Sequence, residues 1–159
     1  MQNDLYELGD EAEIFVYEYI KKNISNNVNI QRVKTPDKGS SSYEEDRHNN
    51  CLNGDIIIGY NNSIRTIGLD VKRSNRGFIS YDSITNFMGD YYCFVIGELE
   101  PENIYFVDLH VAGSYSKSCP ASVGPSGKQG FYLFKGGVEN FRSKMNIYEF
   151  LEKVNSFKS

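Results

Sequence analysis

Residues 54–76 contain the feature that most restricts how this chain can fold, two short apolar stretches separated by a tight polar turn. Their sequence is GDIIIGYNNSIRTIGLDVKRSNR. Apolar runs on both sides of an Asn-rich turn predict a β-hairpin. Because side chains alternate faces along a strand, Asp70 and Lys72 should share one face, with Leu69 and Val71 on the other.

The register of this hairpin decides where Asp55, at its start, lies. A two-residue turn at 62–63 sets Asp55 directly opposite Asp70, whereas a turn at 61–62 leaves Asp70 one diagonal step away. Both registers keep the two carboxylates and Lys72 on one face, and a slip by a single residue would separate them.

Two carboxylates at paired strand positions have Cβ atoms about 4.5–5.5 Å apart. They repel each other unless a cation lies between them. Mg²⁺ prefers oxygen ligands, lowers the pKa of bound water and stabilises charge on a phosphoryl oxygen. Lys72 would hold or deprotonate the attacking water, or stabilise the phosphorus centre. The hairpin is therefore a candidate site for phosphodiester cleavage. The alternative is a pair of solvated strand-end acids, one of them paired with Lys72.

Composition is that of an ordinary globular protein, with 159 residues, 40% hydrophobic and 24% charged. This length predicts a single domain, 1–159. No apolar run is long enough to cross a bilayer, and the acidic N-terminus is unlike a targeting peptide, so we expect a cytoplasmic protein with no membrane partner. The cysteines are odd in number and scattered, which argues against a disulfide framework or a zinc site. They are Cys51, Cys93 and Cys119.

The net charge of −4 gives no general support to nucleic-acid binding, since such proteins are usually basic. The charge is uneven, however, with a balance of −7 over residues 1–102 and +3 over residues 103–159. Several basic side chains, among them Lys72, Arg73 and Arg76, follow the hairpin acids. Nucleic acid could therefore bind through a local surface.

Periodicity predicts an α/β fold with a mixed central sheet flanked by helices. Ser80 should cap a short helix that carries Ile84, Phe87 and Met88, and Asn146 and Glu149 resemble a capping pair. A polar loop over 35–53 and a Gly/Ser/Pro-rich flap or disordered loop over 113–130 should border the site. The expected helices are 4–22 and 146–157, and the expected strands are 28–33, the hairpin strands, 91–97, 103–109 and 131–134.

One family pattern is close to that of this chain. An Asp, about fifteen residues, and then Asp-x-Lys at the end of the next strand is similar to the PD-(D/E)XK nuclease superfamily, whose core runs α-β-β-β-α-β, the restriction-endonuclease-like order. Over residues 5–100 the chain resembles archaeal Holliday-junction resolvases in particular. Gly9 to Glu13 match their G-x-x-x-E start, and the segment 36–42 is also similar. Gly54 stands where the family often has Pro, and Asp70 where Glu is commoner.

The resemblance implies a Mg²⁺- or Mn²⁺-dependent deoxyribonuclease. It assigns metal binding to Asp55, Asp70 and the Val71 carbonyl. It makes Lys72 the catalytic lysine and gives Glu13 a second metal or a metal-bound water.

Three residues after the lysine, Arg73, Ser74 and Arg76, are candidate phosphate contacts, with a solvated turn as the alternative. DNA is the expected substrate and RNA the alternative, and a homodimer is compatible with the sequence. Two rival hypotheses remain. One is a catalytically silent module that binds nucleic acid or protein with a nuclease-like fold, and the other is an unrelated α/β protein with acids at its strand ends.

Overall fold

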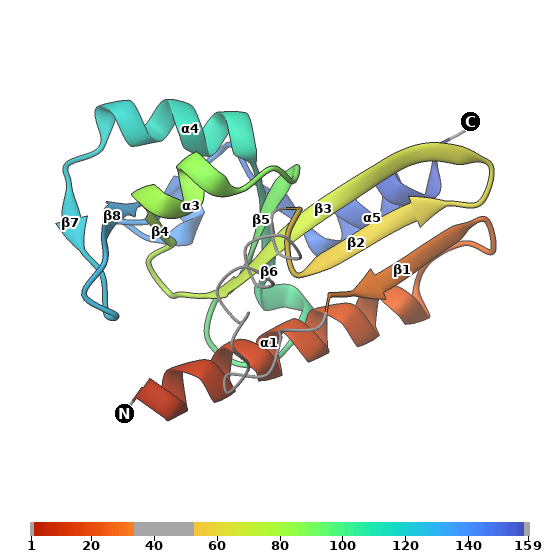
Figure 1. The fold of residues 1–159 in the computed structure, drawn as a ribbon, viewed down its shortest axis with the longest axis horizontal. Coiled ribbons are helices and arrows are strands. Elements are labelled where there is room, and N and C mark those ends of the chain that lie inside the picture. The colour runs from red at the N-terminus through yellow and green to blue at the C-terminus, as the bar shows by residue number, and fades with distance from the viewer. Residues whose placement is uncertain (1, 34–52, 158–159) are drawn as a thin grey trace, which may run out of the picture.

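A computed structural model describes residues 2–33 and 53–157, with side chains from residue 9 onward. Within these residues the chain is an α/β protein with a six-stranded mixed sheet, a small second sheet and four helices (Figure 1). Most of the predicted loop 35–53, together with Cys51, lies outside the described residues.

The main sheet has the order β1-β2-β3-β5-β6-β9. Its neighbouring strands are antiparallel, except that β3 and β5 are parallel. This exception requires a crossover, which contains β4 and α3. The strands are β1 (Val28–Arg32), β2 (Ile56–Tyr60), β3 (Ser63–Arg73), β5 (Tyr91–Val95), β6 (Ile104–Asp108) and β9 (Met145–Asn146).

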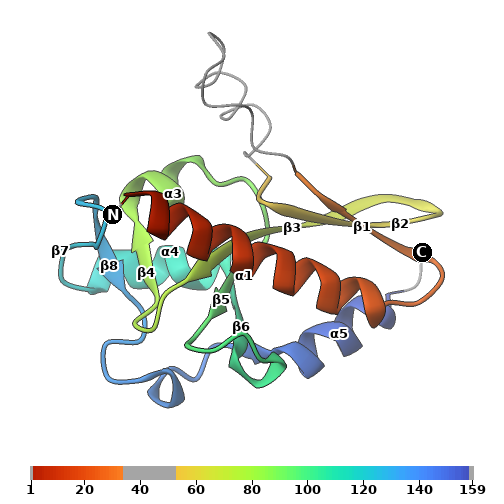
Figure 2. The same ribbon diagram turned by 90° about the horizontal axis from the view of Figure 1, so that it is seen from below.

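The small sheet has the order β4-β8-β7. Figures 1 and 2 both place it beside α3 and α4, at the end of the molecule away from the β2–β3 turn. Its strands are β4 (Phe78–Ser80), β7 (Ser122–Val123) and β8 (Gln129–Tyr132), and the helices are α1 (Gln2–Lys22), α3 (Tyr81–Asn86), α4 (Leu109–Ser118) and α5 (Ile147–Asn155), with short 3-10 turns at Pro101–Asn103 and Val138–Asn140.

β5 is the centre of the structure, and all five of its residues are buried. Tyr91, Cys93 and Val95 belong to a hydrophobic cluster that α1 and α5 cover. Tyr92 and Phe94 belong to a second cluster, with residues from α4 and the small sheet. The apolar run predicts a strand covered on both faces, and the structure confirms this.

α5 begins at the predicted capping pair. The Asn146 side chain accepts from the Glu149 main-chain N–H, and the Glu149 carboxylate accepts from the Asn146 N–H. The helix then buries an apolar face in the first cluster, and its Phe150 ring stacks on Phe106 with 3.9 Å between centroids.

The predicted flap over 113–130 is wrong. Its first part continues α4, which begins where the Asp108 side chain accepts from the His110 N–H, and its later part forms β7 and the start of β8. Ala112 packs into the second cluster and the Tyr115 ring lies 4.9 Å from that of Phe141. These apolar contacts stabilise a helix whose one Gly and three Ser residues disfavour it.

The short helix after Ser80 forms as predicted, with the Ser80 hydroxyl accepting from the Ser83 N–H. Phe87 is buried and Ile84 packs against the second cluster. Phe87 and Met88, however, lie beyond the end of the helix that the sequence expects to carry them, and Met88 is 68% exposed. The helix ends at Asn86, and an extended backbone at Phe87 turns the following residue outward.

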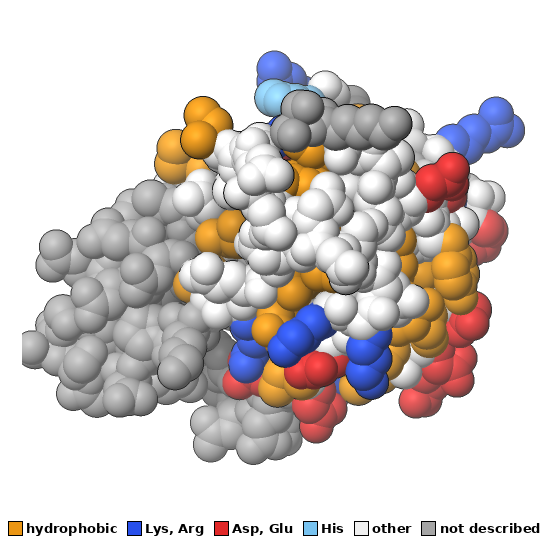
Figure 3. Space-filling model, turned by 90° about the vertical axis from the view of Figure 1, so that its right-hand side faces the viewer, with side chains coloured by type: hydrophobic (Ala, Val, Ile, Leu, Met, Phe, Trp, Pro, Cys, Tyr) orange, Lys and Arg blue, Asp and Glu red, His pale blue; other side chains and the backbone are white. Residues whose placement is uncertain are grey.

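Among the described helices none is both long and apolar enough to cross a membrane. Figure 3 shows the face at the β2–β3 end of the molecule, where Lys and Arg lie among Asp and Glu around an uncharged middle. Because the described charges on this face have both signs, it shows no uniformly basic surface for a polyanion.

We predict that Phe150→Ala lowers the free energy of unfolding by about 3–5 kcal/mol, because it leaves a cavity against Phe106. Tyr148→Ala, on the exposed side of the same helix, should change it by less than about 1 kcal/mol. Urea unfolding measures both, and equal losses would contradict this account of the core.

Candidate functional site

The register of the hairpin places Asp55 against the end of β3. Ile56 pairs with Leu69, and the Asp55 main-chain N–H also donates to the Leu69 carbonyl at 2.7 Å. The Asp55 carboxylate then accepts from the Val71 N–H at 2.8 Å. Asp55 therefore contacts the residues on both sides of Asp70.

The hairpin has the turn of one predicted register and the strand pairing of the other. Tyr60 pairs with Ser63, so the loop is 61–62, whereas Gly59 pairs with Thr66. β3 thus holds two unpaired residues, at 64–65. Side chains alternate faces every residue, so an insertion of two residues does not change the face of any later side chain. Asp70 and Lys72 therefore keep the face that the sequence predicts.

Gly54 makes this entry into β2 possible. Its φ is +109°, and a Cβ at this position would lie 2.2 Å from the Leu69 carbonyl oxygen. Only glycine adopts such a backbone without strain, and proline, with φ near −65°, cannot. The departure from the family's Pro therefore has a local structural cause.

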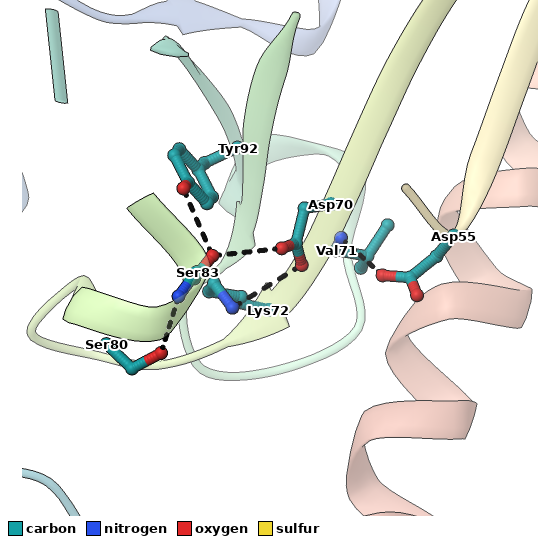
Figure 4. A network of polar contacts seen from close by, with 7 residues as sticks. All are labelled: Asp55, Asp70, Val71, Lys72, Ser80, Ser83 and Tyr92. Atoms are coloured by element: carbon teal, nitrogen blue, oxygen red, sulfur yellow. Dashed lines mark hydrogen bonds and ion pairs between the residues drawn. The ribbon is translucent and has the colours of Figure 1, made fainter. Parts of the chain in front are cut away.

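Asp70 and Lys72 lie on one face of β3, as alternation predicts. The Lys72 ammonium is 3.4 Å from Asp70 Oδ1, and the Ser83 hydroxyl is 3.3 Å from Asp70 Oδ2. Figure 4 shows the Asp70 carboxylate pointing toward Lys72 and Ser83, while that of Asp55 points toward the Val71 nitrogen. The two carboxylates therefore have different partners: Asp55 accepts from Val71, and Asp70 contacts Lys72 and Ser83.

Glu13 is the buried acid of α1, with 8% of its surface exposed. Its Oε1 accepts a hydrogen bond of 2.6 Å from Arg32 Nε, and a second nitrogen of Arg32 is 3.6 Å from Asp10. Burial raises the pKa of Glu13, the Arg32 guanidinium opposes that rise, and the charges of Asp10 and Asp70 add to it.

Asp55 is the most perturbed of the acids. Burial raises its pKa to about 8, with further contributions from the negative charges of Asp70 and Glu13, while the Val71 N–H and the Lys72 charge oppose the rise. The structure thus brings Glu13, Asp55, Asp70 and Lys72 within electrostatic range of one another, from α1, the head of β2 and the end of β3.

The donor set fits a hard cation in its chemistry. Asp55 and Asp70 offer carboxylate oxygens and Val71 a main-chain carbonyl, and Mg²⁺ commonly takes only one or two carboxylates, with waters and substrate phosphate completing its shell. In the part of the chain that the structure describes, no three His, Cys, Asp or Glu side chains form a group that could hold a metal. A site here would therefore depend on two protein carboxylates, with Glu13 held by Arg32.

The first candidate phosphate contact, Arg73, has partners within the protein. One guanidinium nitrogen is 3.7 Å from Glu11 of α1, and another donates to the Gly97 carbonyl at 3.1 Å. Arg73 thereby links α1 to the end of β3, and phosphate binding by this residue stays a prediction.

The other two lie in the turn after β3. The Ser74 hydroxyl accepts from the Phe78 N–H at 2.9 Å, and the Arg76 guanidinium lies 4.3 Å from the centroid of the Tyr132 ring. Ser74 therefore closes the turn, and phosphate binding by Ser74 and Arg76 stays a prediction. Arg76 is exposed above an aromatic ring of the small sheet.

A scan against models of known protein families finds no match for this chain, and a search of the curated proteins finds none either. Every functional inference therefore depends on the residues of the site itself.

Three residues at this site were not predicted as part of it: Arg32, Ser83 and Tyr92. No local pattern could pair Arg32 with Glu13, because the two residues lie in separate elements, β1 and α1. Ser83 is the third residue after the predicted N-cap Ser80, in the first turn of the helix, where its hydroxyl contacts Asp70. No local pattern could identify Tyr92, because its proximity to Asp70 depends on the pairing of β3 with β5.

Gly54→Ala should lower the melting temperature by several degrees, because the new Cβ meets the Leu69 carbonyl in a strained backbone conformation. The matched control is Gly113→Ala, inside α4, where a Cβ meets nothing within 4 Å. That substitution should leave stability unchanged or raise it. Thermal unfolding of both variants checks the pair, and equal tolerance at the two positions would contradict the described entry into β2.

Asp55 should make stability depend on pH. Its folded-state pKa of about 8 lies above the ordinary value of 3.8, so between these values the native state binds more protons than the unfolded state. The free energy of unfolding therefore falls as pH rises through this range. Asp55→Asn removes the charge but keeps an oxygen that can accept from Val71, so its melting temperature should exceed that of the wild type near about pH 8, with a difference that shrinks toward about pH 5.

Melting curves in metal-free buffer with EDTA test this pH dependence. Asp82→Asn, an exposed aspartate of α3, is the control and should show a difference that does not vary with pH. If the melting temperature of the wild type instead rose relative to that of Asp55→Asn as pH increases, the raised pKa of Asp55 would be contradicted.

Proposed function

We propose that this chain is a Mg²⁺- or Mn²⁺-dependent nuclease that hydrolyses phosphodiester bonds of DNA. The observation that carries the proposal is the contact of the Asp55 carboxylate with the Val71 N–H, between the predicted metal ligand Asp70 and the predicted catalytic Lys72. Glu13 adds its charge from α1. Perturbed acids beside a lysine are typical of functional sites, although structural ion pairs also produce them.

The order of elements supports the same proposal. α1, β1, β2, β3, α3 and β5 follow the α-β-β-β-α-β order of the PD-(D/E)XK core, with the short β4 inserted before α3. The Asp at the head of β2 and the Asp-x-Lys at the end of β3 support the same resemblance by their positions on neighbouring strands. We therefore propose a restriction-endonuclease-like core.

The protein's own groups would act in distinct ways. A bound Mg²⁺ supplies a Lewis acid at the phosphoryl oxygen and a water of lowered pKa. Asp55 and Asp70 would hold this ion. Lys72, as an ammonium paired with Asp70, has three N–H donors and no acceptor, which favours holding the attacking water or stabilising phosphoryl charge over proton abstraction.

DNA is the proposed substrate, as the resemblance implies, and RNA is the alternative. The net charge of −4 predicts weak non-specific binding and contact through a local surface near the end of β3. A homodimer is compatible with this proposal.

A second candidate function is a catalytically silent module that binds nucleic acid or protein. The observation that favours it is that each acid already has a partner within the protein. Glu13 is held by Arg32, Asp70 by Lys72 and Ser83, and Asp55 by a main-chain N–H. A site that binds no metal would keep these contacts permanently.

Cleavage assays separate the two candidates. We expect the wild type to cut at least one of single-stranded, duplex or branched DNA, or RNA, with Mg²⁺ or Mn²⁺ and not with EDTA. Asp70→Asn and Lys72→Ala should each reduce the rate by at least about a hundredfold, because each removes a group that acts on the reacting phosphate.

The controls are Asp82→Asn and Lys117→Ala, which make the same chemical changes at exposed positions of α3 and α4. Both should retain wild-type cleavage. Cutting that survives in Asp70→Asn and Lys72→Ala would assign the activity elsewhere, and metal-independent binding without any cutting would favour the silent module.

A further inference from the structure

Asp70 lies beside an aromatic hydroxyl from the neighbouring strand. The parallel pairing of β3 and β5 aligns Asp70 with Tyr92, whose side chain is fully buried in the second hydrophobic cluster. The Tyr92 ring is 5.1 Å from that of Phe87 and 6.4 Å from that of Phe94, measured between centroids. The core thus fixes the position of the Tyr92 hydroxyl.

Ser83 of α3 connects this hydroxyl to the carboxylate. Its Oγ is 3.0 Å from the Tyr92 hydroxyl and 3.3 Å from Asp70 Oδ2 (Figure 4). The backbone of Ser83 is held in turn, because its N–H donates to the Ser80 hydroxyl at 3.1 Å. Two hydroxyl groups, those of Tyr92 and Ser83, therefore lie in series behind one carboxylate.

Counting protons sets the direction of these hydrogen bonds. An ionised carboxylate only accepts, so the single Ser83 proton must point to Asp70. The Tyr92 hydroxyl then has to donate to Ser83 Oγ, since Ser83 has no second proton to give. The order is Tyr92 to Ser83 to Asp70, with each donor polarising the next.

The other carboxylate oxygen has a different partner, since Oδ1 faces the Lys72 ammonium at 3.4 Å. With one oxygen on Ser83 and the other on Lys72, the carboxylate is restricted in rotation about its Cβ–Cγ bond. Partners of this kind, which hydrogen-bond to a ligating carboxylate without touching the ion, orient it and tune its affinity.

We propose that Ser83 and Tyr92 are positioning residues that orient the Asp70 carboxylate for a divalent cation through the relay Tyr92–Ser83–Asp70. The inference rests on the proposed function of this site. It adds two residues, from α3 and β5, that neither the sequence pattern nor the family motif includes.

The test is Mn²⁺ binding to the full chain, measured by isothermal titration calorimetry without nucleic acid. Ser83→Ala should weaken binding about tenfold, because the carboxylate loses its direct donor. Tyr92→Phe keeps the buried ring and should weaken binding by a smaller factor. The double variant should match Ser83→Ala alone, since Tyr92 acts only through Ser83.

The matched control is Tyr91→Phe, which also removes one hydroxyl from β5. Tyr91 faces the opposite cluster, where its hydroxyl accepts a 2.7 Å hydrogen bond from Lys153. Its Mn²⁺ affinity should equal that of the wild type, while its melting temperature reports what a lost buried hydroxyl does to stability alone.

Three outcomes would overturn the inference. Wild-type affinity in both Ser83→Ala and Tyr92→Phe would overturn the relay alone and leave the proposed metal site standing. A double variant whose loss of Mn²⁺ affinity equals the product of the two single losses would also overturn the relay, because Tyr92 and Ser83 would then act independently. A wild type that neither binds Mn²⁺ nor cleaves nucleic acid would overturn the proposed function and the relay with it.

Discussion

β3 lies parallel to β5, with Asp70 beside Tyr92 and Lys72 beside Phe94, and this pairing decides what lies behind the acids of the candidate site. A parallel pair requires a crossover, and here the crossover brings α3 and its Ser83 over the end of β3. The buried residues of β5 hold the pair in place from both faces of the sheet. The same strand thus forms the core and supplies the groups behind the carboxylate.

The three acids of the site are held close against their mutual repulsion. Separate donors compensate them: Arg32 at Glu13, the Val71 N–H at Asp55, and Lys72 with Ser83 at Asp70. The compensation is incomplete, since burial and neighbouring charge still raise the pKa values of Glu13 and Asp55. A divalent cation would relieve this repulsion, and that is the physical reason for proposing a metal site here.

Patterns of local origin were predicted well. The hairpin, the buried run of β5 and the capping box of α5 each depend on spacing or on residues a few positions apart, and all three are present. The errors lie where tertiary contacts overrule composition. A Gly/Ser-rich segment expected as a flap forms the second half of α4, because Ala112 and Tyr115 find apolar partners distant in sequence. Phe87 and Met88 also lie beyond the helix expected to carry them, because α3 ends at Asn86.

The sequence by itself determined which groups could form a site: a carboxylate ahead of β2, and a carboxylate and an ammonium two residues apart in β3. It could do so because strand alternation is a property of the chain alone. Only the tertiary structure decided what surrounds them. The two-residue insertion in the hairpin, the salt bridge of Arg32 with Glu13 and the hydroxyls of Ser83 and Tyr92 all depend on contacts between separate elements. Such contacts form through packing of the whole core, and no local pattern of residues specifies them.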